Sequence, residues 1–300
     1  MTIPICEPPD FQPRSPRTQL PAHAIDTHFH VFGPASRYPL APGRTYTPSD
    51  AGLDAYEELA SVLGFDRAVI VQPSVYGVDN RRTLSVLDQT TLPMRAVVVI
   101  DADITDAELD SLNKRGVRGA RINLVFNPGE SFALATRLAD RIRDIGWHLQ
   151  FLVDVSTIED LALRVKALRI PVVFDHLGHV PTSKGICNAG FRDLLKLVTE
   201  GIGWAKLCGS YRFTRERGLP PYSDVFPFAE ALISANPERV IWGTDWPHPS
   251  IPVPMPNDGD LTEMVLRWAT DEALRRRIFV TNAETLYGFP PAAPLAKSEW

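Results

Sequence analysis

Short apolar runs alternate with longer amphipathic segments eight times along this chain, and this alternation limits the folds open to it. Most of the runs are rich in β-branched and other apolar residues without strict alternation, which is typical of parallel strands buried on both faces. The segments between the runs repeat their apolar residues at helical spacing. The sequence predicts eight strands, at 24–31, 68–72, 95–100, 117–122, 147–153, 170–175, 202–207 and 240–244.

Local start and stop signals support helices between these strands. Thr105 and Ser156 each precede a glutamate by three residues, which is the pattern of a capping box. Gly64, Gly116 and Gly146 stand where helices are expected to end. The predicted helices lie near 51–63, 80–90, 105–115, 131–145, 157–168, 189–199, 224–235 and 261–269.

Eight strand–helix units favour an α/β fold of the (β/α)₈ TIM-barrel type. A doubly wound open sheet is the alternative, but Gly201 and Gly203 lack the third glycine of its phosphate-binding fingerprint. Residues 1–22 contain six prolines and are expected to form an irregular arm. One barrel domain is predicted over 23–290, followed by a tail over 291–300.

Charge and composition favour a protein that acts on small molecules. A net charge of −5 argues against nucleic-acid binding. No stretch reaches the roughly 18 apolar residues of a membrane span. The three cysteines are odd in number and widely spaced, which fits a reducing cytoplasm without a disulfide framework. A homo-oligomer remains open.

Titratable residues gather at the ends of three predicted strands. Asp26, His28 and His30 alternate along the first strand, so their side chains are expected on one side. His176 follows the sixth strand and Asp245 follows the eighth. Because a barrel carries its chemistry at the C-terminal ends of its strands, these residues predict one site.

The residue types suggest roles within this site. The His28–His30 pair fits either a metal site or two imidazoles that polarise a carbonyl group. Asp245, a carboxylate among imidazoles, suits a general base for water. Asp26 is expected to orient an imidazole. His248 follows a proline-constrained turn and is a candidate for the same pocket.

Further candidates at strand ends suit the binding of an acidic substrate. Arg121 ends the fourth strand and Arg212 follows the seventh, and guanidinium groups there can bind a carboxylate in bidentate fashion. Ser74 follows the second strand. The chain has no Gly-x-Ser-x-Gly, His-Glu-x-x-His or Cys-x-x-Cys motif, so serine-nucleophile and zincin chemistry lose their main support.

These motifs, in this order, resemble the amidohydrolase superfamily, and within it the branch of 2-pyrone-4,6-dicarboxylate lactonase. The similarity extends from about residue 24 to 288. The most specific stretch is Trp-Gly-Thr-Asp-Trp-Pro-His-Pro, which ends at Pro249. The other stretches that carry the resemblance lie at 25–34, 71–80, 118–123 and 175–178.

The resemblance implies a distorted (β/α)₈ barrel that hydrolyses a lactone from aromatic or sugar-acid catabolism without a metal cofactor. It implies that Asp245 activates water and that His28, His30 and His176 hold the lactone carbonyl oxygen. The substrate carboxylates and ring would contact Tyr46, Ser74, Arg121 and Arg212.

Two departures from the family and two rival functions stay open. Asn127 and Leu152 stand where the family lactonase has an arginine and a tyrosine that bind acid groups, which favours a substrate with fewer carboxylates. One rival is a zinc-dependent hydrolase or decarboxylase that uses the same histidines and aspartate as ligands. The other is a lactone isomerase, which moves a proton or acyl group without adding water.

Overall fold

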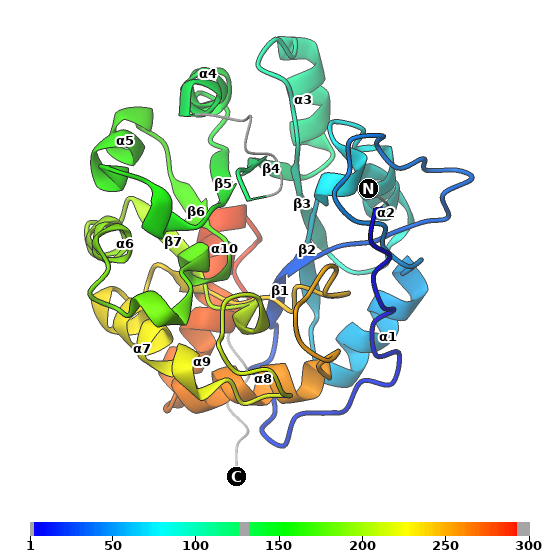
Figure 1. The fold of residues 1–300 in the computed structure, drawn as a ribbon. Helices are drawn as coiled ribbons and strands as arrows, with labels where there is room; N and C mark the ends of the chain where they lie inside the picture. Colours follow the sequence, from blue (N-terminus) through cyan, green and yellow to red (C-terminus); the bar gives the residue numbers. More distant parts are fainter. Residues whose placement is uncertain (1–2, 126–131, 293–300) are drawn as a thin grey trace, which may run out of the picture.

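The computed structural model describes residues 3–125 and 132–292. Its eight strands form one parallel sheet in which each strand pairs with the next along the chain (Figure 1). This order confirms the predicted barrel, and the doubly wound alternative is wrong because its strands do not follow chain order. The strands are β1 (Ile25–Phe29), β2 (Arg67–Val71), β3 (Met94–Val98), β4 (Val117–Asn123), β5 (His148–Leu152), β6 (Val172–Phe174), β7 (Gly203–Lys206) and β8 (Val240–Ile241).

Helices follow the strands and surround them, as Figure 1 shows. The first eight lie where the sequence predicts helices. A short pair, α9 (Glu272–Arg276) and α10 (Asn282–Tyr287), follows the last of these, and α10 lies inside the ring of helices. The first eight are α1 (Leu53–Leu63), α2 (Arg81–Gln89), α3 (Asp106–Lys114), α4 (Phe132–Ile142), α5 (Leu161–Leu168), α6 (Ala189–Thr199), α7 (Phe226–Ala235) and α8 (Asp258–Trp268).

One of the two predicted capping boxes forms and the other does not. Thr105 accepts a hydrogen bond from the Glu108 amide, and the Glu108 side chain accepts one from the Thr105 amide. The prediction at Ser156 is wrong, because Asp154 accepts the Ser156 amide and closes a short 3₁₀ turn before α5 begins. An aspartate two residues before an amide competes for it in this way.

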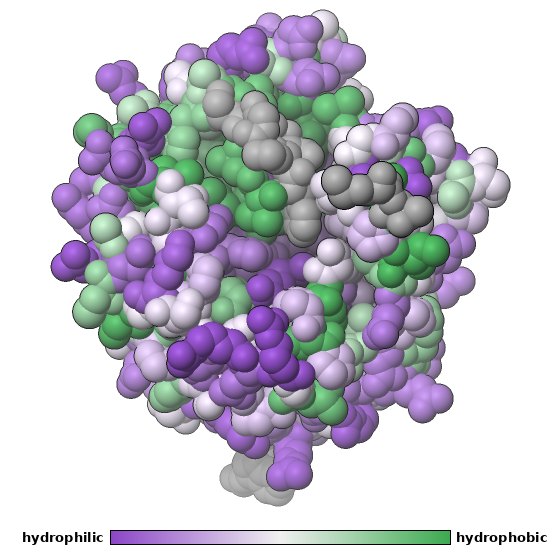
Figure 2. All heavy atoms as spheres, in the orientation of Figure 1, coloured by the Kyte–Doolittle hydropathy of each residue, from purple (hydrophilic) through white to green (hydrophobic). Residues whose placement is uncertain are grey.

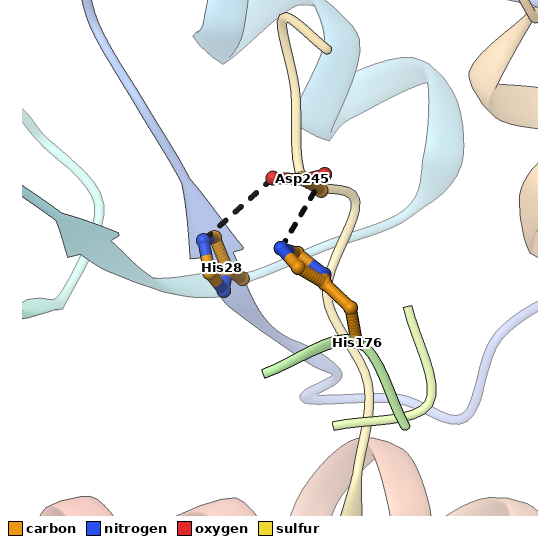
Figure 3. A group of neighbouring side chains, drawn as sticks. All are labelled: His28, His176 and Asp245. Atoms are coloured by element: carbon orange, nitrogen blue, oxygen red, sulfur yellow. Dashed lines mark ion pairs between the residues drawn. The ribbon is translucent and has the colours of Figure 1, made fainter. Parts of the chain in front are cut away.

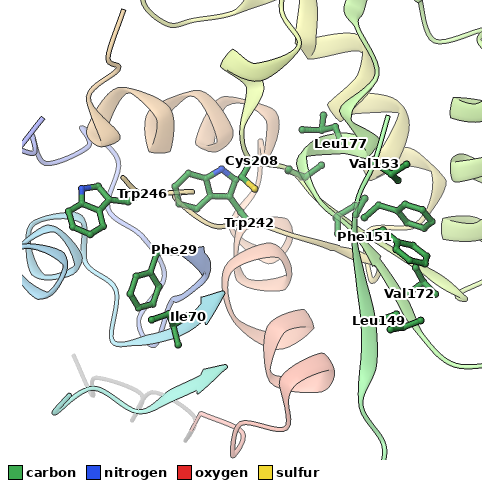
Figure 4. Packing of buried hydrophobic residues seen from close by; sticks show 14 of the residues in the cluster. Phe29, Ile70, Leu149, Phe151, Val153, Val172, Leu177, Cys208, Trp242 and Trp246 are labelled. Carbon is green, nitrogen blue, oxygen red and sulfur yellow. The ribbon is translucent and has the colours of Figure 1, made fainter. Parts of the chain in front are cut away.

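The core lies on both faces of the strands. A large cluster packs the helices against the sheet, and Figure 4 shows Leu149, Phe151 and Val172 of the neighbouring strands β5 and β6 within it. A smaller cluster joins inward-facing side chains such as Val173 to Tyr287 on α10. Because both faces are covered, the strands read as continuous apolar runs.

The ring closes at one seam, between β1 and the segment that follows β8. The Thr27 amide donates to the carbonyl oxygen of Trp242 at 3.1 Å. The Asp245 amide donates to the carbonyl oxygen of His28 at 2.7 Å. The barrel is therefore nearly closed, and its seam places Asp245 directly beside β1.

A buried carboxylate holds this seam. Asp26 accepts the amides of His28 and Thr244 at 3.0 and 2.9 Å, and the hydroxyls of Thr244 and Tyr56 at 2.7 and 3.1 Å. A Cβ on Gly243 would lie 2.4 Å from the His28 nitrogen, so only glycine permits this approach. The expectation that Asp26 orients an imidazole is wrong, since it holds backbone on both sides of the seam.

The N-terminal arm, described from residue 3, lies against the loop that precedes α8. Ile5 forms a bridge with Thr47, and the Asn257 side chain donates to Asp10 at 2.7 Å. Arg14 pairs with Asp260 at 2.6 Å. No helix within the described ranges has both the length and the apolar character needed to cross a bilayer.

We predict that Thr244→Val weakens the seam. The valine has nearly the shape of threonine but loses the hydroxyl that donates to Asp26, which should lower the free energy of unfolding by about 1–3 kcal/mol. Thr199→Val is the matched control, because that exposed hydroxyl donates only to the Leu195 carbonyl inside α6. Urea titration of both variants measures the difference, and equal losses would contradict the structural role of Asp26.

Candidate active site

Most of the predicted site residues line a small cavity at the C-terminal ends of the strands, and His28, which does not line it, lies against His30 and Asp245. Figure 2 shows hydrophilic side chains in a hollow on the face that Figure 1 presents. In Figure 3, His28 of β1, His176 after β6 and Asp245 after β8 point toward one another. The cavity is lined by His30, Tyr46, Ser74, Arg121, Asn123, Leu152, His176, Arg212, Asp245 and Pro249.

Asp245 presents one free oxygen to this cavity. Its Oδ2 accepts hydrogen bonds from the Tyr211 hydroxyl and from Nε of Arg212, both at 2.7 Å. Its Oδ1 is buried, has no hydrogen-bond partner among the described residues, and lies 3.7 Å from Nε2 of both His28 and His30. Burial alone would raise the pKa of Asp245, but the Arg212 charge and the surrounding imidazoles hold it well below its usual value. Asp245 is therefore an anion with a free lone pair.

Hydrogen bonds fix different protonation patterns on the two β1 histidines. His30 Nδ1 lies 2.7 Å from the Val71 carbonyl oxygen, which only accepts, so Nδ1 carries the hydrogen and Nε2 a lone pair. His28 Nε2 lies 3.3 Å from His30 Nε2 and therefore donates to it. His28 Nδ1 then accepts from Lys206 Nζ at 3.2 Å. His30 thus accepts at its inner nitrogen, whereas His28 donates.

His176 adds a second donor. Its Nε2 lies 3.9 Å from Oδ2 of Asp245, and its Nδ1 lies 3.4 Å from Sγ of Cys208. Burial raises the pKa of the Cys208 thiol well above its usual value, so the thiol keeps its hydrogen and can direct it at Nδ1. In that tautomer the inner nitrogen of His176 carries the hydrogen of the ring. A Cβ on Gly209 would lie 2.3 Å from Nδ1, so the glycine leaves room for this ring.

Burial lowers the pKa of all three rings, which favours their neutral form at physiological pH. Burial lowers the pKa of His28 to about 4, against the opposing charge of Asp175. Burial also holds the pKa values of His30 and His176 well below the usual value. An unperturbed imidazole has a pKa near 6.5, so the pKa values of these three rings lie below the usual one.

A layer of buried charge beneath the rings was missed by the sequence reasoning. Lys206 of β7 donates to the Thr27 carbonyl oxygen at 2.8 Å and to Gln150 Oε1 at 3.0 Å. Asp175 lies 3.3 Å from His28 Nδ1 and 3.7 Å from Lys206 Nζ. The available signal was a lysine inside a buried strand, because a charge there is costly unless it is paired.

The two predicted arginines line the cavity and are anchored from behind. Arg121 donates to Asp175 at 3.1 Å and to the Gln72 carbonyl oxygen at 3.1 Å. Arg212 holds Asp245 through Nε and the Pro249 carbonyl oxygen through Nη1. With neutral histidines, the two guanidinium groups and the single carboxylate of Asp245 give the cavity lining a net charge of +1. An anionic ligand is favoured there.

The remaining predicted residues divide between the cavity and its surroundings. Ser74 donates to the Tyr46 hydroxyl at 3.4 Å, and both line the cavity. Leu152 contributes an apolar wall. His248 does not line this cavity and lies behind Tyr211. Asn127 lies outside the described residues.

The same groups offer ligand atoms for a metal ion. One nitrogen each of His28 and His176 and one oxygen of Asp245 lie within 4.8 Å of one another. The donor types suit Zn²⁺. In that case His28 would have to shift its hydrogen to Nδ1, where Asp175 Oδ1 at 3.3 Å would accept it. Lys206 and Arg212, which already contact two of the three donor groups, oppose a further cation.

Comparison with known proteins places this site in a family. The amidohydrolase family model matches residues 25–289. The chain is 39% identical over 292 residues to a 4-sulfomuconolactone hydrolase of Hydrogenophaga intermedia, covering 95% of each chain. It is 36% identical over 287 residues to a 2-pyrone-4,6-dicarboxylate hydrolase of Comamonas testosteroni, covering 92% of this chain and 93% of that protein.

Two further similarities cover nearly the whole chain. A D-galactarolactone isomerase of Agrobacterium fabrum is 34% identical over 283 residues, with 92% of this chain and 95% of that protein covered. A crystal structure from Agrobacterium tumefaciens superposes with a TM-score of 0.84 at 32% identity, covering 92% of this chain and all of that one.

The neutral histidines predict an unusual pH profile. Because the pKa of His28 is about 4 and those of Asp245, His30 and His176 are also lowered, these groups should leave kcat/KM flat from pH 8 down to about 6. A fall is expected near pH 6, where Asp26, whose pKa burial raises to about 6, gains a proton and the seam weakens. The profile is measured with circular dichroism at each pH to confirm folding, and a limb with its midpoint near pH 7 in folded protein would contradict the assignment.

Proposed function

This chain belongs to the amidohydrolase family, and from that premise we propose that it hydrolyses a small anionic lactone with Asp245 as general base. One observation carries the proposal. The free Oδ1 of Asp245 is buried among three neutral imidazoles, of which two donate and one accepts. This arrangement suits a water molecule that is deprotonated next to a carbonyl group that gains negative charge.

Each group has a distinct part in the proposed reaction. On substrate binding, the hydrogen bond between His28 Nε2 and His30 Nε2 would be replaced by bonds to the reactants. A water molecule between Asp245 Oδ1 and His30 Nε2 would then donate its hydrogens to both. The inner N–H groups of His28 and His176 would donate to the carbonyl oxygen as it becomes an oxyanion. Each such donor typically contributes on the order of 10²–10³ in rate. This refines the expectation that all three histidines polarise the carbonyl, because His30 has no hydrogen on its inner nitrogen.

The cavity supports a substrate that carries an acid group. The relatives named above are hydrolases of 4-sulfomuconolactone and of a pyrone dicarboxylate, and both names describe lactones with acidic substituents. Here Arg121 and Arg212 would bind such a substituent, while Tyr46 and Ser74 would contact the ring. The apolar wall at Leu152 favours fewer acid groups on that side of the substrate.

We propose that the reaction proceeds without a resident metal ion. A lactone is more electrophilic than an amide, and an enol-type leaving group departs without strong acid assistance. Two N–H donors can therefore supply the stabilisation that a Lewis acid gives elsewhere. A divalent cation on His28, His176 and Asp245 would instead polarise the carbonyl group directly, and this is the competing form of the proposal.

Lactone isomerisation is the second candidate. The observation that favours it is the 34% identity to a D-galactarolactone isomerase over nearly the full chain. An isomerase would use Asp245 or a histidine to move a proton or acyl group within the substrate. Product mass separates the two, because hydrolysis adds one water and isomerisation leaves the mass unchanged.

We predict that Asp245→Asn lowers kcat by about 10²–10⁴ with the fold intact, because the amide cannot accept the proton of water. Turnover of carboxylated lactones is followed by mass spectrometry of the product. Asp110→Asn is the control, since that exposed carboxylate pairs only with Lys114 on the surface of α3. Activity of Asp245→Asn within tenfold of the parent would remove Asp245 as the base.

Elemental analysis of the purified, untagged protein tests the metal-free form of the proposal. We expect much less than one zinc or manganese per chain in protein that is fully active, with no loss of activity in a chelator. About one metal per chain, together with activity that is lost on chelation and restored by the ion, would instead establish metal-assisted chemistry.

A further inference from the structure

A buried hydrogen-bonded chain extends from Asp245 away from the catalytic cavity. The Tyr211 hydroxyl lies 2.7 Å from Asp245 Oδ2 and 2.6 Å from His248 Nδ1. His248 Nε2 lies 3.1 Å from Oδ1 of Asp258, the first residue of α8. All four side chains are at most 1% exposed. The chain links the general base to a histidine that the proposed reaction does not use.

The three hydrogen bonds of this chain need three hydrogens, but a neutral Tyr211 and a neutral His248 supply only two. The Tyr211 hydroxyl has a single hydrogen, so it can donate to Asp245 or to His248, but not to both. If it donates to Asp245, His248 must donate from Nδ1 to Tyr211 and from Nε2 to Asp258, and the ring is an imidazolium. If His248 is neutral and donates to Asp258, the Tyr211 hydrogen turns to Nδ1. The chain therefore has two states that differ by one proton.

The far end of the chain can hold a positive charge and reaches a second cavity. Asp258 lies at the N-terminus of α8, where the helix dipole stabilises its carboxylate as the partner of an imidazolium. His248 also lines a second cavity, which lies between the N-terminal arm and the loop that follows His248. The titratable groups on that cavity are Cys6, Glu7 and Tyr46.

We propose that Tyr211 and His248 carry the proton of each turnover from Asp245 to this second cavity. This inference depends on the proposed hydrolysis. Attack of water forms a C–O bond at the carbonyl carbon, the ring C–O bond breaks, and the leaving oxygen takes one proton. The product acid is ionised near neutral pH, so one proton remains on Asp245.

Asp245 must lose that proton before it can act as a base in the next turnover. The Asp245 carboxyl group first turns about its Cβ–Cγ bond, which brings the protonated oxygen to the Tyr211 hydroxyl. The proton then passes to the Tyr211 oxygen while the hydrogen of Tyr211 moves to His248 Nδ1. His248 holds it as an imidazolium beside Asp258 and loses it to water in the second cavity. Asp245 is then an anion again, ready for the next water. His248 is thus a residue for proton transfer and does not contact the substrate.

Quenched-flow and steady-state kinetics on His248→Asn test the proposal. Asparagine can still donate a hydrogen bond to Tyr211 but cannot take up a proton. The first turnover should keep the parent rate, whereas steady-state kcat should fall at least tenfold and rise again with buffer concentration, with KM little changed. Tyr211→Phe should also lower kcat, and Tyr222→Phe is its matched control. That neighbouring buried hydroxyl has no hydrogen-bond partner among the described residues.

A second variant guards against a simple loss of structure. His248 has φ of 57°, which glycine adopts freely, so His248→Gly leaves a ring-sized space without backbone strain. Added imidazole should restore its kcat, whereas a ring of equal size that is a much weaker base should not.

Two outcomes would overturn the relay. Equal slowing of the first and later turnovers would show that His248 only positions its neighbours, and unchanged kinetics would show that the chain carries no proton. Failure of the proposed function is distinct, because the parent protein itself would then hydrolyse no lactone.

Discussion

The carboxylate of Asp26 is the contact on which the geometry of the site depends. It joins the backbone of β1 to Thr244, the residue before Asp245, across the one seam of the barrel. β8 has only two residues, so ladder hydrogen bonds alone would place this segment weakly. Since His28 and Asp245 lie on opposite sides of the seam, the same four hydrogen bonds set the distance between the Asp245 carboxylate and the His28 imidazole.

A second layer of buried charge sets the protonation of the rings rather than the stability of the fold. Lys206, Asp175 and Arg121 lie below the cavity, where removing ions from water costs several kcal/mol each before pairing repays it. A buried cluster of paired charges such as this one is therefore weak evidence that the cluster stabilises the fold. Its effect here is specific: the Lys206 ammonium directs its hydrogen at Nδ1 of His28, which favours the tautomer with the ring hydrogen on Nε2, toward Asp245.

The sequence predicted the barrel because the alternation of a mainly apolar run with a helical segment is repeated eight times. It also placed His28, His30, His176 and Asp245 together, since the C-terminal ends of parallel strands meet on one face. It could not place Lys206, which lies in an apolar run that reads as an ordinary strand. The position of His248 behind Tyr211 depends on a turn after β8 that no periodic pattern describes.

Backbone conformation explains why these side chains converge so closely. His176 and Asp245 have φ of 52° and 62°, in the left-handed region that costs a non-glycine residue about 1–3 kcal/mol. His176 lies two residues after β6 and Asp245 four residues after β8, in the turns that carry the chain out of the barrel. The surrounding contacts hold them there: Gly209 leaves space for the His176 ring, and the Asp245 amide is tied to β1. A site built in this way is rigid before substrate arrives. In the proposed hydrolysis, the hydrogen-bond donors would therefore need little reorganisation as negative charge develops on the carbonyl oxygen.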